Sequence, residues 1–238
     1  MARILYVHVP KCGGTSFGAA LRLVHPFAQA GIDIDRARAE ALAEAPQLAG
    51  RALIAADYRR RDRQLRDHLA RGTACISGHV QLSEALLDGP AQGWLAVTLL
   101  RDPVARFVSH YAYLQRHHPD PARAATLEAF LDTDDALRLG SEYLFHFGGD
   151  WQGPGADPDL GPRAARTLAR CALVGDLARP GQFARDLSRL ARRPLPRLAR
   201  NRAPAPAEVP APLRARIETI CAPDIALFRA AMRDRCAA

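Results

Sequence analysis

The chain has 238 residues, of which 48% are hydrophobic and 24% are charged, the balance of a soluble globular protein. This length suits one α/β domain of ordinary size, so a single domain is expected over residues 1–238. No apolar run is long enough to span a bilayer, and no signal-peptide pattern follows the first residues, so we expect a cytoplasmic protein. The five cysteines lack metal-binding spacing, which predicts reduced thiols and no metal site.

The charge of the chain is strongly positive, with a formal net charge of +8. Such an excess favours anionic partners, among them nucleic acids, acidic polysaccharides and phosphorylated nucleotides. Lys11 is the only lysine among 33 basic residues, and all the others are arginines. A lysine kept where arginine is otherwise used indicates a position that needs a compact ammonium group.

The first third of the chain predicts a buried strand followed by helices. Residues 3–9 form a short apolar run rich in β-branched and aromatic side chains, which predicts the strand. Helix-forming residues follow over 15–24. The Arg- and Ala-rich region 33–72 is mostly helical in character, and a short strand is predicted within it at 52–56.

The middle of the chain predicts two more strands, at 74–77 and 94–100. Asp102 and Pro103 then supply an N-cap and a proline at the first helical position. The apolar residues of this helix recur at helical spacing: Phe107, Val108, Tyr111 and Leu114.

The rest of the chain is expected to be rich in helices. The predicted helices cover 126–147, 162–170, 180–192 and 209–236. A short strand is predicted at 171–175. Because strands alternate with helices, the predicted fold class is α/β, with a P-loop-like parallel sheet, helices on both faces and a helix-rich C-terminal half. Ligands of such sheets bind beyond the carboxyl ends of the strands.

The segment after the first strand has the composition of a phosphate-binding loop. It reads His-Val-Pro-Lys-Cys-Gly-Gly-Thr-Ser over residues 8–16. Amides at the start of a helix bind anions, and glycines let a phosphate oxygen approach the backbone. Lys11 precedes the glycines, whereas the lysine of a Walker A loop follows them, which argues against an ordinary ATPase or GTPase. The alternative is a plain strand-to-helix turn capped by Thr15 or Ser16.

Two more segments begin at the ends of predicted strands. Arg101 could grip a phosphate bidentately, and Ser109 could add a hydroxyl donor, although Arg-Asp-Pro is in isolation only a capped helix start. His79 follows Gly78 at the end of another strand, and a neutral histidine suits a general base. A lone histidine is, however, more often a loop or helix-cap residue.

The three segments together resemble sulfotransferases that use PAPS (3′-phosphoadenosine 5′-phosphosulfate), particularly the group related to heparan sulfate 2-O-sulfotransferases. The loop resembles the 5′-phosphosulfate loop of that family, the Arg-Asp-Pro segment its 3′-phosphate site, and Gly-His-Val the segment with its catalytic histidine. The resemblance implies that Lys11 and His79 are catalytic. It implies that the residues binding the cofactor PAPS are Lys11, Cys12, Gly13, Gly14, Thr15, Ser16, Arg101 and Ser109.

The implied reaction moves a sulfuryl group from PAPS to a hydroxyl and releases PAP (adenosine 3′,5′-bisphosphate), without a metal. A carbohydrate is the acceptor class of the resembled group, and a lipid or another small alcohol is the open alternative. Some relatives carry a second histidine where this chain has Ser77. A looser resemblance near the end of the chain makes Arg200, Asn201 and Arg202 further binding candidates.

Two other functions compete with this interpretation. A P-loop-type small-molecule kinase would prefer ATP and depend on magnesium, but the order of Lys11 and the glycines argues against it. A nucleic-acid-binding module is suggested by the charge and by the arginines at 59–61. The sequence contains no recognised nucleic-acid motif and few aromatic residues between the basic ones, so no nucleic-acid partner is predicted.

Overall fold

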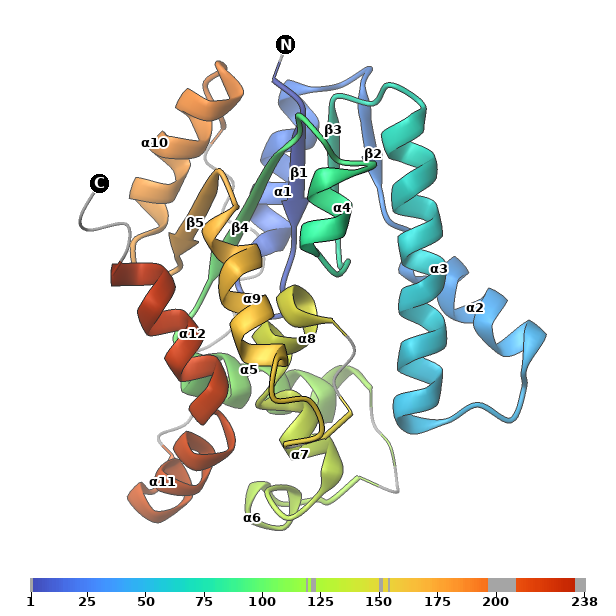
Figure 1. The fold of residues 1–238 in the computed structure, drawn as a ribbon. Helices are drawn as coiled ribbons and strands as arrows, with labels where there is room; N and C mark the ends of the chain where they lie inside the picture. The colour runs from blue at the N-terminus through green and yellow to red at the C-terminus, as the bar shows by residue number, and fades with distance from the viewer. Residues whose placement is uncertain are drawn as a thin grey trace.

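The structure, a computed structural model, describes residues 2–118, 120, 123–149, 152–153, 155–196 and 209–233. Within these ranges, five parallel strands form one sheet in the order β2-β3-β1-β4-β5 (Figure 1). The strands are β1 (Ile4–Val7), β2 (Gln29–Gly31), β3 (Cys75–Gly78), β4 (Leu95–Leu100) and β5 (Leu173–Asp176). β1 lies at the centre, with β3 on one side and β4 on the other.

Successive side chains of each strand point to opposite faces of the sheet. These side chains are apolar on both faces, so helices cover both of them. Ile4 and Tyr6 of β1 face a cluster that contains Leu21 and Phe183. The helices on this face are α1 (Gly14–Val24) and α10 (Pro180–Ala191). Leu5 and Val7 face the opposite cluster. The helices there are α4 (Glu84–Asp88), α8 (Glu142–Gly148), α9 (Leu160–Ala169) and α12 (Ala222–Arg233). The predicted α/β class with helices on both faces is therefore confirmed.

A third group of helices lies beyond the carboxyl ends of the strands (Figure 1). It consists of α5 (Pro103–His117), α6 (Leu127–Phe130), α7 (Asp134–Leu139) and α11 (Ala211–Ile220). Their apolar side chains form a separate cluster around Phe107 and Phe130. Asp102 caps α5 by accepting a hydrogen bond from the Ala105 amide at 2.9 Å, as its position before Pro103 predicts.

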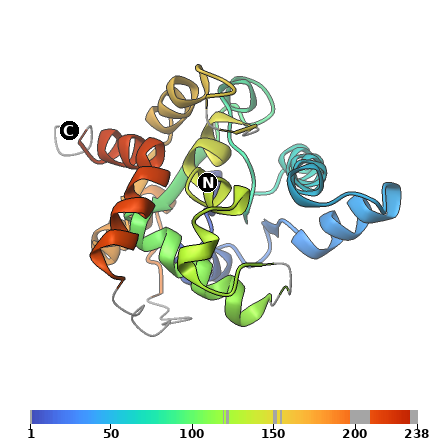
Figure 2. The same ribbon diagram turned by 90° about the horizontal axis from the view of Figure 1, so that it is seen from below.

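Helices α2 (Ile34–Glu44) and α3 (Gly50–Ala70) stand beside the β2 edge of the sheet in both views (Figures 1 and 2). They pack on each other through Ala41, Leu53 and Ala56. Farther along α3, Leu65 and Leu69 join the apolar cluster on the face of the sheet that α8 and α9 cover. The first two turns of α3, residues 50–56, are called the wing below. Arg51 of the wing forms an ion pair with Asp134 of α7, so this part of α3 faces the helices beyond the strand ends.

Three predictions about the elements are wrong. The strand expected at 52–56 lies inside α3, where Leu53 and Ala56 are buried at helical spacing. The single helix expected over 126–147 is divided into α6, α7 and α8, because Thr126 and Thr133 each cap a new helix start. The helix expected over 209–236 is interrupted at Cys221, between α11 and α12.

Strand β2 was not predicted, since Gln-Ala-Gly lacks the β-branched and aromatic residues typical of strands. Its pairing with β3 makes it a strand. Along the described ranges, every helix is too short or too polar to cross a membrane.

Candidate active site

The three segments singled out in the sequence leave the sheet side by side. In the register of the sheet, Val7 of β1 is opposite Gly78 of β3 and Thr98 of β4. The phosphate loop, His79 and Arg101 therefore follow neighbouring strand ends. Arg101 also contacts the loop directly, since its Nη1 donates to the Lys11 carbonyl oxygen at 3.5 Å. This edge is where ligands of open α/β sheets bind.

The two glycines of the loop have different structural roles. Gly13 has a φ of +74°, a left-handed conformation that favours glycine, and it is the N-cap residue of α1. Having no side chain, it cannot cap the first amides of the helix as Asp102 does in α5. Position 14 has no room for a side chain, because a methyl group on Gly14 would lie 1.8 Å from Cδ2 of His8. The loop thus ends at a helix N-terminus that suits an anion.

Lys11 has a φ of +64°, which is rare for a residue other than glycine and indicates local backbone strain. Its ammonium lies 4.0 Å from the centre of the Tyr113 ring, within the range of a cation–π interaction. Partial burial, followed by the charges of Arg116 and Arg101, lowers the pKa of Lys11. Three cations therefore gather at the loop, and a bound anion would relieve their repulsion.

Tyr143 of α8 joins the two predicted phosphate segments. Its hydroxyl accepts a hydrogen bond from the Arg101 amide at 3.0 Å and donates one to the Arg101 carbonyl oxygen. The same hydroxyl lies 3.7 Å from Sγ of Cys12. Cys12 is fully buried, and burial raises its pKa to about 11, so its side chain is a neutral thiol that packs inward. Any contact of Cys12 with a bound anion would therefore come from its backbone.

His79 has the tautomer that a general base needs. Its Nδ1 lies 2.6 Å from the His8 carbonyl oxygen, which can only accept, so Nδ1 carries the proton and Nε2 is the basic nitrogen. Burial, followed by the nearby His146 and Arg61, lowers the pKa of His79 to about 4. The imidazole is therefore neutral at neutral pH.

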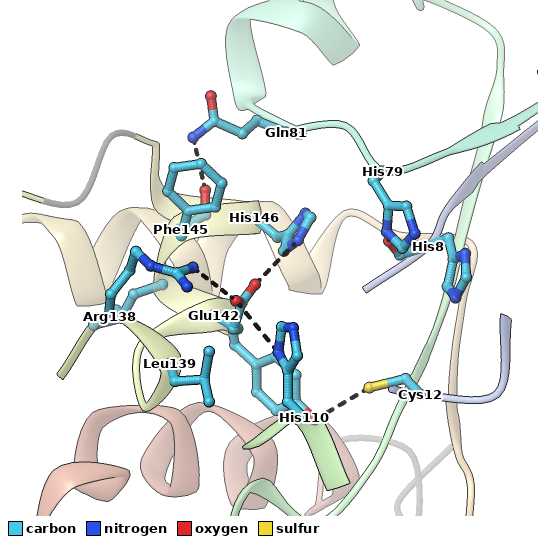
Figure 3. A network of polar contacts seen from close by, with 12 residues as sticks. His8, Cys12, His79, Gln81, His110, Arg138, Leu139, Glu142, Phe145 and His146 are labelled. Carbon is cyan, nitrogen blue, oxygen red and sulfur yellow. Dashed lines mark hydrogen bonds and ion pairs between the residues drawn. The ribbon is translucent and has the colours of Figure 1, made fainter. Parts of the chain in front are cut away.

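A buried charge network lies beside His79 (Figure 3). Glu142 is within 3.4 Å of Arg138, 3.5 Å of His146 and 3.8 Å of His110. Burial alone would raise the pKa of Glu142, but its cationic and histidine neighbours outweigh that effect and keep it lowered. His146 donates from Nδ1 to the Val80 carbonyl oxygen, one residue after His79. No local sequence motif marks this network or Tyr143.

The other predicted residues lie around the same edge. Thr15 is exposed and Ser16 is partly exposed in the first turn of α1, and Ser109 is partly exposed in the second turn of α5. Ser77 accepts a hydrogen bond from Arg22 at 3.1 Å. The candidates at 200–202 lie outside the described residues. Over the part of the chain that is described, no group of three or more His, Cys, Asp or Glu side chains is arranged to hold a metal ion.

A cavity of about 420 Å³ lies between the wing and α8. It is lined by Arg51, Ala52, Ile54, Ala55, Arg138, Glu142, Phe145 and Gln152. Glu142 and Arg138 thus belong both to this cavity and to the charge network beside His79.

Comparison with protein families finds a match for this chain. The model described as "Sulfotransferase family" matches residues 2–136, more than half of the chain. The matched segment contains the phosphate loop, His79, Arg101 and Ser109. No curated protein matches the chain.

Proposed function

The chain belongs to the sulfotransferase family and is therefore a transferase of sulfuryl groups, and we propose that it takes this group from PAPS and places it on a carbohydrate hydroxyl. The observation that carries the proposal is the contact between the phosphate loop and Arg101, which brings the two predicted anion-binding segments together at one edge of the sheet. PAPS carries phosphate groups on both its 5′ and 3′ sides, so it needs two such segments.

The residues present fit this donor. The uncapped N-terminus of α1 suits the 5′-phosphosulfate, and Lys11 lies beside it with an ammonium that a nearby anion would stabilise. Arg101 and Ser109 would select the 3′-phosphate. Thr15 and Ser16 would add hydroxyl donors to the 5′ side.

The residues of the site would divide the chemistry between them. When bound, PAPS supplies a sulfuryl group that is activated by its phosphate linkage. Nε2 of His79 would take the proton of the acceptor hydroxyl as the new bond to sulfur forms. Lys11 would stabilise the negative charge that develops on the leaving bridging oxygen. Transfer releases PAP and the sulfated acceptor.

The acceptor would enter between the wing and α8. The cavity there has charged groups on Arg51, Arg138 and Glu142 that can bond to sugar hydroxyls or carboxylates, and Phe145 offers a ring to an apolar sugar face. The resemblance of the loop and of the Gly-His-Val segment to heparan sulfate 2-O-sulfotransferases favours a carbohydrate over other alcohols.

Calorimetry with PAP tests the donor site first, with AMP, ADP and ATP–Mg²⁺ as controls. Selective binding of PAP without magnesium supports the proposal, and a preference for ATP–Mg²⁺ would support a kinase instead. Transfer is then measured with labelled PAPS on a panel of unsulfated heparosan, unsulfated chondroitin and an aryl alcohol. Transfer to the aryl alcohol alone would contradict the carbohydrate proposal.

The base is tested separately with His79→Ala. This variant should lose turnover on the best acceptor of the panel and keep its affinity for PAP. Full turnover by this variant would remove His79 from the mechanism.

A further inference from the structure

The side chain of His8, the first residue of the phosphate loop, lies between Gly14 of that loop and His79. Its ring stacks on the His79 ring, with 4.2 Å between the ring centroids and 26° between the planes (Figure 3). The ring also lies close to Gly14, because a methyl group there would lie 1.8 Å from His8 Cδ2 and 2.1 Å from Nε2. One imidazole therefore touches both the residue that would take the proton and the loop that would hold the phosphosulfate.

The backbone and the side chain of His8 hold His79 in different ways. The carbonyl oxygen fixes the tautomer of His79 through its 2.6 Å contact with Nδ1. The side chain covers one face of the His79 ring. The Tyr6 ring is also nearly parallel to the His8 ring, with 6.1 Å between the ring centroids. A substitution at His8 can therefore remove the stacking without removing the hydrogen bond.

The chemical state of His8 is compatible with such a role. Burial, followed by the nearby His79, His146, Arg22 and Lys11, lowers the pKa of His8 well below its usual range. Two neutral imidazoles can stack without charge repulsion. A rigid neutral spacer is what an in-line transfer needs, because the base must stay at a fixed distance from the sulfur.

We propose that His8 is a positioning residue, whose ring sets the distance between His79 and the phosphosulfate loop. This inference rests on the proposed function of His79 as the base. It adds the residue that directly follows β1 to the reaction, and it explains why Gly14 must lack a side chain, since the His8 ring occupies that space.

The first test compares His8→Ala with His8→Phe. In His8→Ala we expect kcat to fall about 30-fold with the PAP dissociation constant changed by less than about threefold, because small displacements of a reacting group cost large factors in rate. His8→Phe keeps a flat ring on His79 and should regain most of the lost kcat. Long-range ¹H–¹⁵N spectra of His79 should show the Nδ1–H tautomer in both variants. The ring-current shift that the ring at position 8 produces on His79 should be lost only in His8→Ala.

The second test is a double-mutant cycle with Gly14→Ala. The added methyl group displaces the His8 ring or the loop, so Gly14→Ala alone should weaken PAP binding by at least about tenfold. Adding His8→Ala removes the collision and should restore PAP binding to within about threefold of the wild type. Turnover should remain as low as in His8→Ala, because the spacer is still missing.

The outcomes separate this inference from the proposed function. If the wild type does not bind PAP, or if His79→Ala is fully active, the proposed function fails. If the wild type binds PAP and His79→Ala is inactive, but His8→Ala turns over at the wild-type rate, only the role of His8 fails. The positioning role is also overturned if His8→Phe is as slow as His8→Ala, or if the double variant binds PAP as weakly as Gly14→Ala.

Discussion

The ammonium of Lys11 lies 4.0 Å from the centre of the Tyr113 ring, so an aromatic residue of α5 holds the only lysine of the chain at the mouth of the loop. Tyr113→Leu removes this ring and leaves Lys11 free to turn away. We expect PAP affinity, measured by calorimetry, to fall about two- to fivefold, the loss of an exposed cation–π interaction. Tyr113→Phe keeps the ring and should bind PAP like the wild type. Equal losses in the two variants would assign the effect to the hydroxyl group instead.

The strained backbone of Lys11 makes a second prediction about stability and turnover. Lys11→Gly and Lys11→Ala both lack the ammonium, so both should lower kcat by about a hundredfold or more. Only glycine accepts a φ of +64° without strain. Lys11→Gly should therefore have a free energy of unfolding about 1 kcal/mol above that of Lys11→Ala, as measured by urea denaturation. Equal stabilities would show that the loop relaxes around alanine.

With His79 as the proposed base, its lowered pKa of about 4 predicts where the acid limb of the pH profile lies. Because the base must be neutral, kcat/KM should stay level from neutrality down to about pH 5 and fall only as the pH approaches 4. A limb centred at 6.5, the ordinary histidine value, would contradict the arrangement.

The same shift affects stability. Between pH 6.5 and 4, His79 is protonated in the unfolded chain but stays neutral in the folded protein. Because the unfolded state binds more protons, the free energy of unfolding decreases as the pH falls through this window. His79→Gln removes this contribution, so urea denaturation at pH 7 and pH 5 should show a smaller loss of stability than in the wild type. An equal loss in the two proteins would count against a lowered pKa.

The hydrogen bonds between the Tyr143 hydroxyl and the Arg101 backbone predict that one substitution affects both stability and donor binding. Tyr143→Phe leaves the backbone amide and carbonyl of Arg101 without their shared hydroxyl partner, which should lower the free energy of unfolding by about 1–3 kcal/mol. Affinity for PAP should fall as well, because Arg101 shifts relative to the loop. Tyr111→Phe is the matched control, since its hydroxyl bonds to Ala125 away from the loop. That variant should leave PAP binding unchanged.

The cavity beside the wing predicts where the acceptor binds. Ala55→Trp fills part of this cavity, so KM for the acceptor should rise at least about tenfold while the affinity for PAP stays the same. Ala43→Trp adds the same side chain on an exposed position of α2, outside the cavity, and should not change KM. An unchanged KM in Ala55→Trp would show that the acceptor does not bind in this cavity.

The parts of the site that sequence could predict are those encoded in neighbouring residues. Lys11 and the two glycines stand together, and Asp102 and Pro103 mark a helix start on their own, so short-range chemistry identifies them. Tyr143 lies 42 residues from Arg101 and 131 from Cys12, and only the packing of α8 under the strand ends brings them together. No local pattern reports such a contact.

The errors in the fold have a similar origin. The Ala-Leu-Ile-Ala-Ala run within α3 is short and apolar, and such runs suit a strand or a helix equally until their neighbours are known. Strand β2 owes its conformation to its pairing with β3 and not to its own residues. The order of the strands, which places the three segments side by side, also depends on contacts between distant parts of the chain.

The close fit of Gly14 against the His8 ring has a consequence for sequence variation in this family. A side chain at position 14 is excluded only while a ring occupies position 8, so the two positions should not vary independently. Relatives with a small residue at position 8 can admit alanine or serine at position 14, whereas relatives that keep the ring should keep the glycine. Covariation between these two positions would then record a packing constraint on the loop.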